Sequence, residues 1–192
     1  MRWIRYSLAG HEPAYGMLDD DDRVTPVRGN PLAGYEATAD KLRLDDVTIE
    51  VPVIPPTFYC VGLNYVKHIG SVGLSVPKKP DVGYRANNAL IAHGQDVVMP
   101  ADATKVHYEG ELVVVIGKRV RNIGVDEVKD CIFGYTIGND VSERNWQQSD
   151  RTFWRAKNSD TFKPMGPWIS TEADIASMQT IVTVNGKETT RF

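Results

Sequence analysis

Short runs of apolar residues, separated by turn-forming and charged residues, recur along the whole chain. The strongest apolar run covers 111–116, and further runs cover 2–8, 58–62 and 133–138. Each run has the length and the β-branched or aromatic content of a strand rather than of a helix. The pattern therefore predicts a mostly β protein of the α+β class, with short helices.

Two turn signals sharpen this prediction. The acidic run 19–22 lies between the strand-like segments 14–18 and 23–27 and predicts the turn of a hairpin. Asn185-Gly186 follows the strand-like segment 181–184, and Asn-Gly is a strong signal for a tight hairpin turn. Both pairs of segments are expected to form antiparallel strands.

The segments between these runs predict smaller elements. We expect one helical turn over 64–68, a short helix over 125–130 and a short strand over 97–100. Residues 70–88 are rich in Gly, Pro and Asn and predict a long loop. Segment 47–54 is β-rich but contains a proline, which favours an edge strand or a linker.

Pro55-Pro56 marks a boundary between two parts of the chain that differ in residue pattern. We expect residues 1–55 to form a small N-terminal β domain and residues 56–192 to form a larger second domain. The second domain ends at Phe192, soon after the expected turn at 185–186, so we expect its fold to lack a C-terminal part.

Composition narrows the class of protein. The 192 residues include 22 Lys and Arg against 25 Asp and Glu, and 42% are hydrophobic, which is typical of a globular protein with a core. The net charge of −3 gives no electrostatic footprint for nucleic acid. No segment approaches the roughly 18 apolar residues of a membrane span, and no signal peptide is evident. We expect a cytoplasmic protein in which Cys60 and Cys131 are reduced and buried.

Three carboxylates stand at the ends of predicted strands. Glu109 and Glu111 flank Gly110, and side chains at i and i+2 of a strand point to the same side. Asp140 follows the apolar run 133–138. Neighbouring carboxylates repel each other, and an all-oxygen set suits Mg²⁺, Mn²⁺ or Ca²⁺ better than zinc. The alternative is that Glu109 and Glu111 are exposed charges at a strand edge.

A second polar pattern begins at Asp140. If the segment 140–147 is helical, Asp140, Arg144 and Gln147 lie on one face, where they could bind an anion beside a metal. An ordinary surface pair of Asp140 with Arg144 is the alternative. Lys157 could polarise a carbonyl or hold a carboxylate, or it could be a solvated lysine.

His68 is the best acid–base candidate among the four histidines, because it follows a junction between strand and turn. A core or exposed histidine remains the alternative. His11 and His93 have loop-like contexts that indicate surface positions. His107 lies two residues before Glu109 and is a weaker candidate for supporting a metal ligand.

Several segments together resemble the fumarylacetoacetate hydrolase family in motif, order and spacing. The resemblance covers about residues 57–190, and residues 1–55 resemble the small N-terminal domain of some bacterial members. The matching pieces are Val61-Gly-Leu-Asn-Tyr65 with His68, Tyr108-Glu-Gly-Glu-Leu112, the segment 134–144, Gln147, Lys157-Asn-Ser-Asp-Thr-Phe162 and Pro164-Met-Gly-Pro-Trp168.

The resemblance implies a mixed β-roll or sandwich catalytic domain, a homodimer, and a Mg²⁺ or Mn²⁺ cofactor, with Ca²⁺ a further option. It implies roles for eight residues: Glu109, Glu111 and Asp140 as metal ligands, His68 and Lys157 as catalytic residues, and Arg144, Gln147 and Arg85 as substrate-binding residues.

The resemblance also implies an enzyme that acts on carbon–carbon bonds. Its substrate would be a small 2-oxo or 1,3-dicarbonyl acid, which reacts through a metal-stabilised enolate. Hydrolysis of an acylpyruvate is the leading reaction, with an oxaloacetate-type decarboxylase or a dienoate isomerase or tautomerase as alternatives. A metal-binding scaffold without turnover is the alternative of another class.

The sequence departs from the family pattern at specific positions. Ser71 stands where many members have a glutamate paired with the histidine, which weakens the prediction of hydrolysis. Arg85 stands where a lysine is common, and it keeps the charge but not the geometry. Residues 59–61 are apolar where some members have a fourth metal carboxylate, so we expect three ligands.

Overall fold

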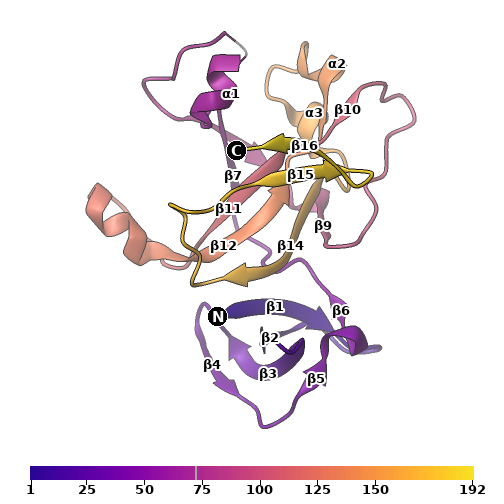
Figure 1. Cartoon of the computed structure of the whole chain (residues 1–192), viewed down its shortest axis with the longest axis vertical. Coiled ribbons are helices and arrows are strands. Elements are labelled where there is room, and N and C mark those ends of the chain that lie inside the picture. The colour runs from indigo at the N-terminus through magenta and orange to yellow at the C-terminus, as the bar shows by residue number, and fades with distance from the viewer. Residues whose placement is uncertain (72) are drawn as a thin grey trace.

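The structure, a computed structural model, describes residues 1–71 and 73–192, except for the side chains of Lys67, His68 and Ser71. Strands dominate it and its helices are short (Figure 1), so the prediction of a mostly β fold is confirmed. The helices are α1 (Val66–Ser71), α2 (Arg144–Gln147) and α3 (Trp154–Asn158), and the 3₁₀ helices are η1 (Leu44–Asp46), η2 (Asn87–Ala89) and η3 (Val125–Cys131). The strands are β1 (Arg2–Ser7), β2 (Ala14–Leu18), β3 (Arg23–Asn30), β4 (Gly34–Ala37), β5 (Leu42–Arg43), β6 (Thr48–Ile49), β7 (Phe58–Gly62), β8 (Asp81–Arg85), β9 (Leu90–Ala92), β10 (Val106–His107), β11 (Gly110–Ile116), β12 (Ile132–Asn139), β13 (Ser142–Glu143), β14 (Lys163–Ser170), β15 (Ile181–Val184) and β16 (Lys187–Arg191).

The N-terminal part is an antiparallel meander, β1 to β4, at the bottom of Figure 1. Its own core contains Ile4, Tyr6, Leu18 and Val24, which are all buried. The acidic run forms the predicted turn between β2 and β3. There the Asp19 carboxylate accepts the backbone N–H of Arg23 at 2.8 Å, which closes the turn.

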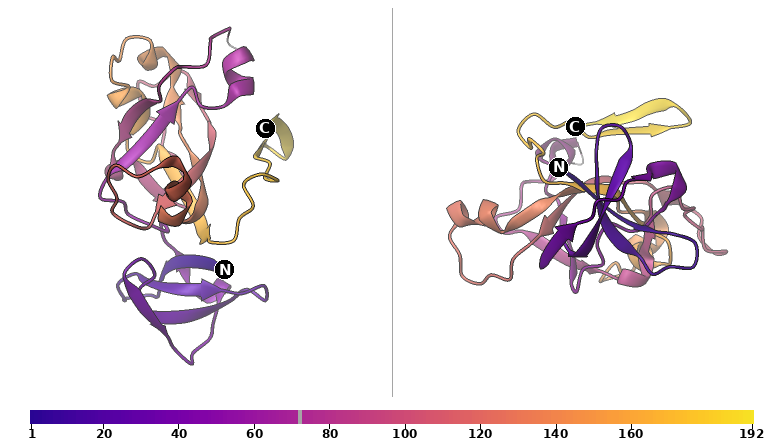
Figure 2. Two further views of the ribbon diagram at one scale, coloured as in Figure 1. Left: turned by 90° about the vertical axis from the view of Figure 1, so that its left-hand side faces the viewer. Right: turned by 90° about the horizontal axis from the view of Figure 1, so that it is seen from below.

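The two parts of the chain share one sheet in the described residues. Ten strands belong to it, and its main path runs β11-β12-β14-β1-β2-β3-β4. Strand β1 pairs antiparallel with β14, with Trp3 opposite Ile169. Trp3 and Ile169 also share a hydrophobic cluster with Val27 and Val115. Figure 2 shows the N-terminal part directly below the rest, so this pairing and its cluster fix the position of one part on the other.

Antiparallel pairing of β11 with β12 creates the edge at which the polar residues gather. The register runs from Gly110 opposite Asn139 to Ile116 opposite Ile132. The start of β11 therefore lies beside the end of β12. Residues just before Gly110 and just after Asn139 are brought together by this register alone.

Some predicted elements differ from the structure. The predicted loop 70–88 contains β8, which pairs with β7 in full register from Phe58–Arg85 to Gly62–Asp81. Strand β8 was not predicted because glycines and prolines surround it and favour a loop, although its residues vary between exposed and half-buried. Strand β9 was also missed, because it has only three residues and owes its conformation to parallel pairing with β14.

The predicted strand 97–100 is wrong, because this segment has no ladder partner in the structure. The backbone N–H of Val98 donates instead to the hydroxyl of Thr161 at 2.8 Å, and the Val98 and Met99 side chains are exposed. In the segment 47–54 only β6 is a strand. This agrees with the prediction, based on its proline, that the segment is an edge strand or a linker. The C-terminal hairpin of β15 and β16 forms as predicted.

No helix in residues 1–71 and 73–192 is long and apolar enough to cross a membrane.

Thr136 on β12 provides a test of the core. Its hydroxyl is buried and has no hydrogen-bond partner among the described residues. Thr136→Val replaces the hydroxyl with a methyl group of similar volume and removes a desolvated polar atom. We expect the free energy of unfolding to stay constant or rise by about 1 kcal/mol, as measured by urea denaturation. A clear loss of stability would show that the hydroxyl has a partner.

Candidate functional site

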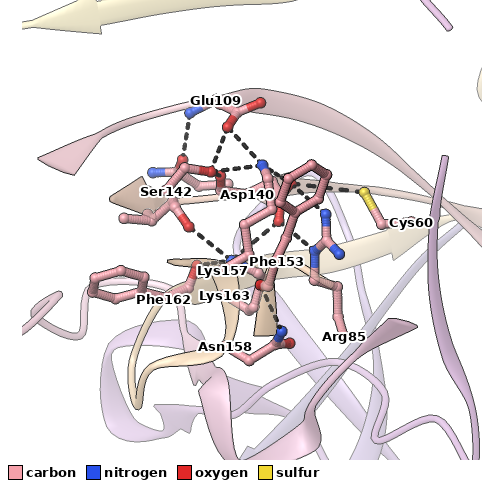
Figure 3. A network of polar contacts seen from close by, with 12 residues as sticks. Cys60, Arg85, Glu109, Asp140, Ser142, Phe153, Lys157, Asn158, Phe162 and Lys163 are labelled. Carbon is pink, nitrogen blue, oxygen red and sulfur yellow. Dashed lines mark hydrogen bonds and ion pairs between the residues drawn. The ribbon is translucent and has the colours of Figure 1, made fainter. Parts of the chain in front are cut away.

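Polar residues from several elements converge where β11 begins and β12 ends (Figure 3). The backbone N–H of Asp140 donates to the Glu109 carbonyl at 2.9 Å, and the backbone N–H of Glu109 donates to the Asn139 side chain at 2.9 Å. These bonds hold Glu109 and Asp140 side by side at the edge of the sheet. Two of the three carboxylates predicted from the sequence, Glu109 and Asp140, are therefore neighbours in space.

Asp140 is buried and forms ion pairs with several cationic side chains. Two nitrogens of the Arg85 guanidinium donate to its carboxylate, Nε to Oδ1 at 2.8 Å and Nη2 to Oδ2 at 2.9 Å. Lys157 Nζ lies 2.6 Å from Oδ2, and Lys163 Nζ lies 3.1 Å from Oδ1. Burial would raise the pKa of Asp140, but these three cations outweigh it and hold the pKa well below its usual range. Asp140 is therefore an ionised carboxylate across the physiological range.

Glu109 faces the more open side of the cluster, and about a quarter of its side chain is exposed. Its Oε1 atom lies 2.8 Å from Lys157 Nζ and 3.1 Å from Arg144 Nη1, and it accepts the hydroxyl of Ser142. Glu109 therefore connects the buried group around Asp140 with the more exposed Arg144.

Glu111 differs from the other two carboxylates. Among the described side chains, no lysine or arginine forms an ion pair with it. Burial raises the pKa of Glu111 to about 7, a hydrogen bond from Tyr65 opposes this, and the charges of Asp140 and Glu109 add to it. Glu111 is thus a partly desolvated carboxylate that repels its neighbours.

Lys157 reaches the cluster from α3. Its buried ammonium lies 2.8 Å from Glu109 Oε1 and 2.6 Å from both Asp140 Oδ2 and Ser142 Oγ. These three acceptors use all three N–H donors of the ammonium. The reading of Lys157 as a solvated surface residue is therefore wrong, and its cation lies between two of the predicted metal ligands.

Arg144 and Gln147 lie together on α2, as predicted. Arg144 Nη1 donates to Gln147 Oε1 at 2.9 Å, and Nε donates to Nδ1 of His107 at 3.4 Å. The helix, however, begins at Arg144, so the prediction that Asp140 shares its face is wrong. Asp140 lies between β12 and β13. Glu109 connects it to Arg144, because the Glu109 carbonyl accepts the Asp140 N–H and the Glu109 carboxylate forms an ion pair with Arg144.

The Arg85 guanidinium already binds other protein groups, whereas a substrate-binding arginine would keep donors free for the substrate. Its side chain is only 6% exposed, and its guanidinium is directed at Asp140 and at the carbonyl of Tyr84. Cys60, on the paired strand β7, points to the same carboxylate, with its sulfur 3.7 Å from Oδ2. Burial raises the pKa of the Cys60 thiol to about 11, so it is a neutral neighbour.

Two buried charged residues were missed in the sequence. Lys163 opens β14 and contacts Asp140, and Glu143 precedes α2. Nothing in the local pattern distinguishes either from an exposed charge, because their burial comes from strands distant in the sequence. His68 and Ser71 belong to α1, but their side chains lie outside the described residues. His11 and His93 are exposed, as predicted.

Glu143 positions α2 and yields a test. Its Oε1 accepts the backbone N–H groups of Thr104 and Lys105 at 3.1 and 2.7 Å, and its Oε2 caps the helix at Trp146. Glu143→Gln replaces one acceptor oxygen with an N–H donor, so at least one backbone N–H loses its partner. We expect unfolding to cost about 1–3 kcal/mol less, measured by urea denaturation. Glu36→Gln, at an exposed position, should leave stability unchanged.

The donor set has the right chemistry for a hard divalent cation. Glu109 and Asp140 lie together, and Glu111 is near enough for their charges to raise its pKa, while no described cation forms an ion pair with it. Within the described residues, no three His, Cys, Asp or Glu side chains are arranged closely enough to hold a metal. Lys157 holds two of the three carboxylates together instead. The oxygen ligands thus suit a hard divalent cation in type, while in this structure the Lys157 ammonium joins two of them.

Comparisons with known proteins match both parts of the chain. Residues 57–192 match the family model described as fumarylacetoacetate (FAA) hydrolase, C-terminal. Residues 1–52 match the model described as Rv2993c-like, N-terminal. A curated relative, protein Rv2993c of Mycobacterium tuberculosis, is 42% identical over 176 residues, which cover 89% of this chain and 66% of that protein.

Solved structures share the fold over the whole chain. A 5-carboxymethyl-2-hydroxymuconate delta-isomerase from Mycobacterium smegmatis is 33% identical with a TM-score of 0.90. A fumarylacetoacetate hydrolase from Exiguobacterium antarcticum is 28% identical with a TM-score of 0.83. This chain covers 75% of each of those chains, and it spans between 46% and 66% of three curated relatives.

Proposed function

The chain belongs to the fumarylacetoacetate hydrolase family, and from this we propose that it is a divalent-metal-dependent enzyme that acts on a small 2-oxo or 1,3-dicarbonyl acid. The observation that carries the proposal is the cluster at the start of β11. There Glu109 and Asp140 lie among lysines and arginines, and their charges raise the pKa of the neighbouring Glu111. An anionic substrate and a cation with oxygen ligands both suit this mixture of charges.

Glu109, Glu111 and Asp140 would hold the cation, Mg²⁺ or Mn²⁺. When bound, it would act as a Lewis acid on the keto oxygen of the substrate. The protein's own cations support the same chemistry. Lys157 presents a buried positive charge beside these carboxylates, where it would stabilise negative charge that develops on a carbonyl oxygen.

Arg144 and Gln147 would hold the substrate carboxylate, because they form the more exposed side of the cluster. An arginine fork matches the geometry of a carboxylate. His68 on α1 would move a proton or prepare water. Arg85 would act through Asp140, since its donors already bind that carboxylate.

Hydrolysis of a carbon–carbon bond in an acylpyruvate is the reaction that we propose first. It agrees with the name of the Exiguobacterium relative, a hydrolase. Isomerisation of a ring-cleavage dienoate is the second candidate, and the name of the Mycobacterium smegmatis relative favours it. Ser71, in place of an acidic partner for His68, also favours it, because isomerisation needs no activated water.

A turnover screen tests the proposal. The panel contains an acylpyruvate, oxaloacetate and a ring-cleavage dienoate, each with Mg²⁺ or Mn²⁺ and each repeated with EDTA. We expect EDTA-sensitive cleavage of the acylpyruvate. Turnover of the dienoate alone would support the isomerase, and turnover of oxaloacetate alone a decarboxylase. Metal binding without any turnover would favour a scaffold and contradict the proposal.

A further inference from the structure

Lys163 carries a buried charge that the proposed reaction does not use directly. Its side chain is 3% exposed. Its ammonium lies 3.1 Å from Asp140 Oδ1 and donates to the carbonyls of Val141 at 2.9 Å and Phe162 at 2.8 Å. Figure 3 shows it on the side of Asp140 that faces away from Glu109.

These contacts fix the position of the Lys163 head group. Its N–H groups donate to two backbone carbonyls, and the Asp140 carboxylate lies within ion-pair distance. Burial lowers the pKa of Lys163 to about 8 and the Asp140 carboxylate opposes this shift, so the ammonium is the main form at pH 7. Both carbonyls belong to the backbone, so the head group is tied to the residue that follows Asp140 and to the residue that precedes Lys163. Unlike Arg144, it contacts none of the described residues on the open side of the cluster, so its ammonium is held beside Asp140.

The charges around it do not balance. The carboxylates are Glu109, Glu111 and Asp140. Glu109 and Asp140 each form an ion pair with at least one cation other than Lys163. Among the described residues, the cations that contact these carboxylates are Arg85, Arg144, Lys157 and Lys163. Four positive side chains thus face three negative ones. A divalent cation would increase this excess, and an anionic ligand would reduce it.

We propose that Lys163 is a positioning residue that acts through Asp140 and shifts the preference of the site from the bare divalent cation toward an anionic ligand. This inference rests on the proposed function, because it requires both a cation and an anion at the cluster. Lys163 does not touch either one. Its fixed charge lowers the affinity of the carboxylates for a cation alone and raises the affinity of the loaded site for a dianion.

Calorimetric titration tests the inference with two probes, Mn²⁺ alone and oxalate in the presence of saturating Mn²⁺. Lys163→Met removes the charge at similar length, and Lys163→Gln removes it but keeps an amide donor for the carbonyls. For both variants we expect Mn²⁺ to bind about tenfold more tightly and oxalate about tenfold more weakly. Lys129→Met, which removes an exposed charge from η3, should change neither affinity.

The opposite signs separate this role from a structural one. A residue that only supports the fold would weaken both affinities together or change neither, and either result would overturn the inference. Failure of both variants to fold would also overturn it, because Lys163 would then serve the fold. Absence of Mn²⁺ binding in the wild-type protein would instead contradict the proposed function itself.

Discussion

Replacing Glu111 with glutamine should weaken Mg²⁺ or Mn²⁺ binding by about 100-fold or more and lower turnover by a similar factor. Glu111 is the carboxylate whose charge has no direct ion pair among the described residues, and its pKa is raised to about 7 by burial and by its acidic neighbours. A divalent cation would offset that charge. The measurements are a calorimetric titration with Mn²⁺ and the rate on the best substrate of the screen.

The same variant should be more stable than the wild type when metal is absent. Because the pKa of Glu111 is raised from 4.5 to about 7, its ionisation destabilises the fold increasingly as the pH rises through this range. A neutral amide avoids that cost, so the melting temperature of Glu111→Gln at pH 8 with EDTA should exceed that of the wild type. Equal metal affinity in both proteins would remove Glu111 from the ligand set.

Replacing Lys157 with methionine should have the second large effect. The variant leaves Glu109 and Asp140 facing each other without the ammonium between them. In EDTA, the free energy of unfolding should fall by about 3 kcal/mol, and Mg²⁺ should restore part of it because a cation relieves the same repulsion. Turnover with saturating metal should fall by about 10²–10³-fold.

Lys187→Met is the matched control for this change, because Lys187 lies exposed on β16. It should alter neither stability nor turnover. Wild-type turnover in Lys157→Met, at full metal occupancy, would assign Lys157 a purely structural role. A loss of stability that Mg²⁺ does not reverse would show that the cation does not bind between these carboxylates.

The sequence predicts the strands best where side chains alternate and turns are explicit. The runs at 2–8, 58–62, 111–116 and 133–138 are all strands, because β-branched and aromatic residues favour a pleated, half-buried surface. Strand β9 and the pairing of β1 with β14 are different in kind. They depend on partners more than 70 residues away, which no local pattern encodes.

The candidate site shows the same division. Glu109 and Asp140 could be brought together in prediction because they flank two adjacent antiparallel strands. Lys163 and the direction of Arg85 could not, because their roles arise only when β14 and β8 reach Asp140. The helical spacing predicted a shared face for Asp140 and Arg144, but α2 begins at Arg144 and the ion pair of Arg144 is with Glu109.

A calorimetric titration of the wild-type protein with Mn²⁺ near pH 7.5 tests the central claim most directly. The account predicts one Mn²⁺ per chain, bound with a dissociation constant in the micromolar range or below, and little or no binding by Glu111→Gln over the same range. No binding by the wild-type protein, or equal binding by Glu111→Gln, would contradict the assignment of Glu109, Glu111 and Asp140 as a metal centre.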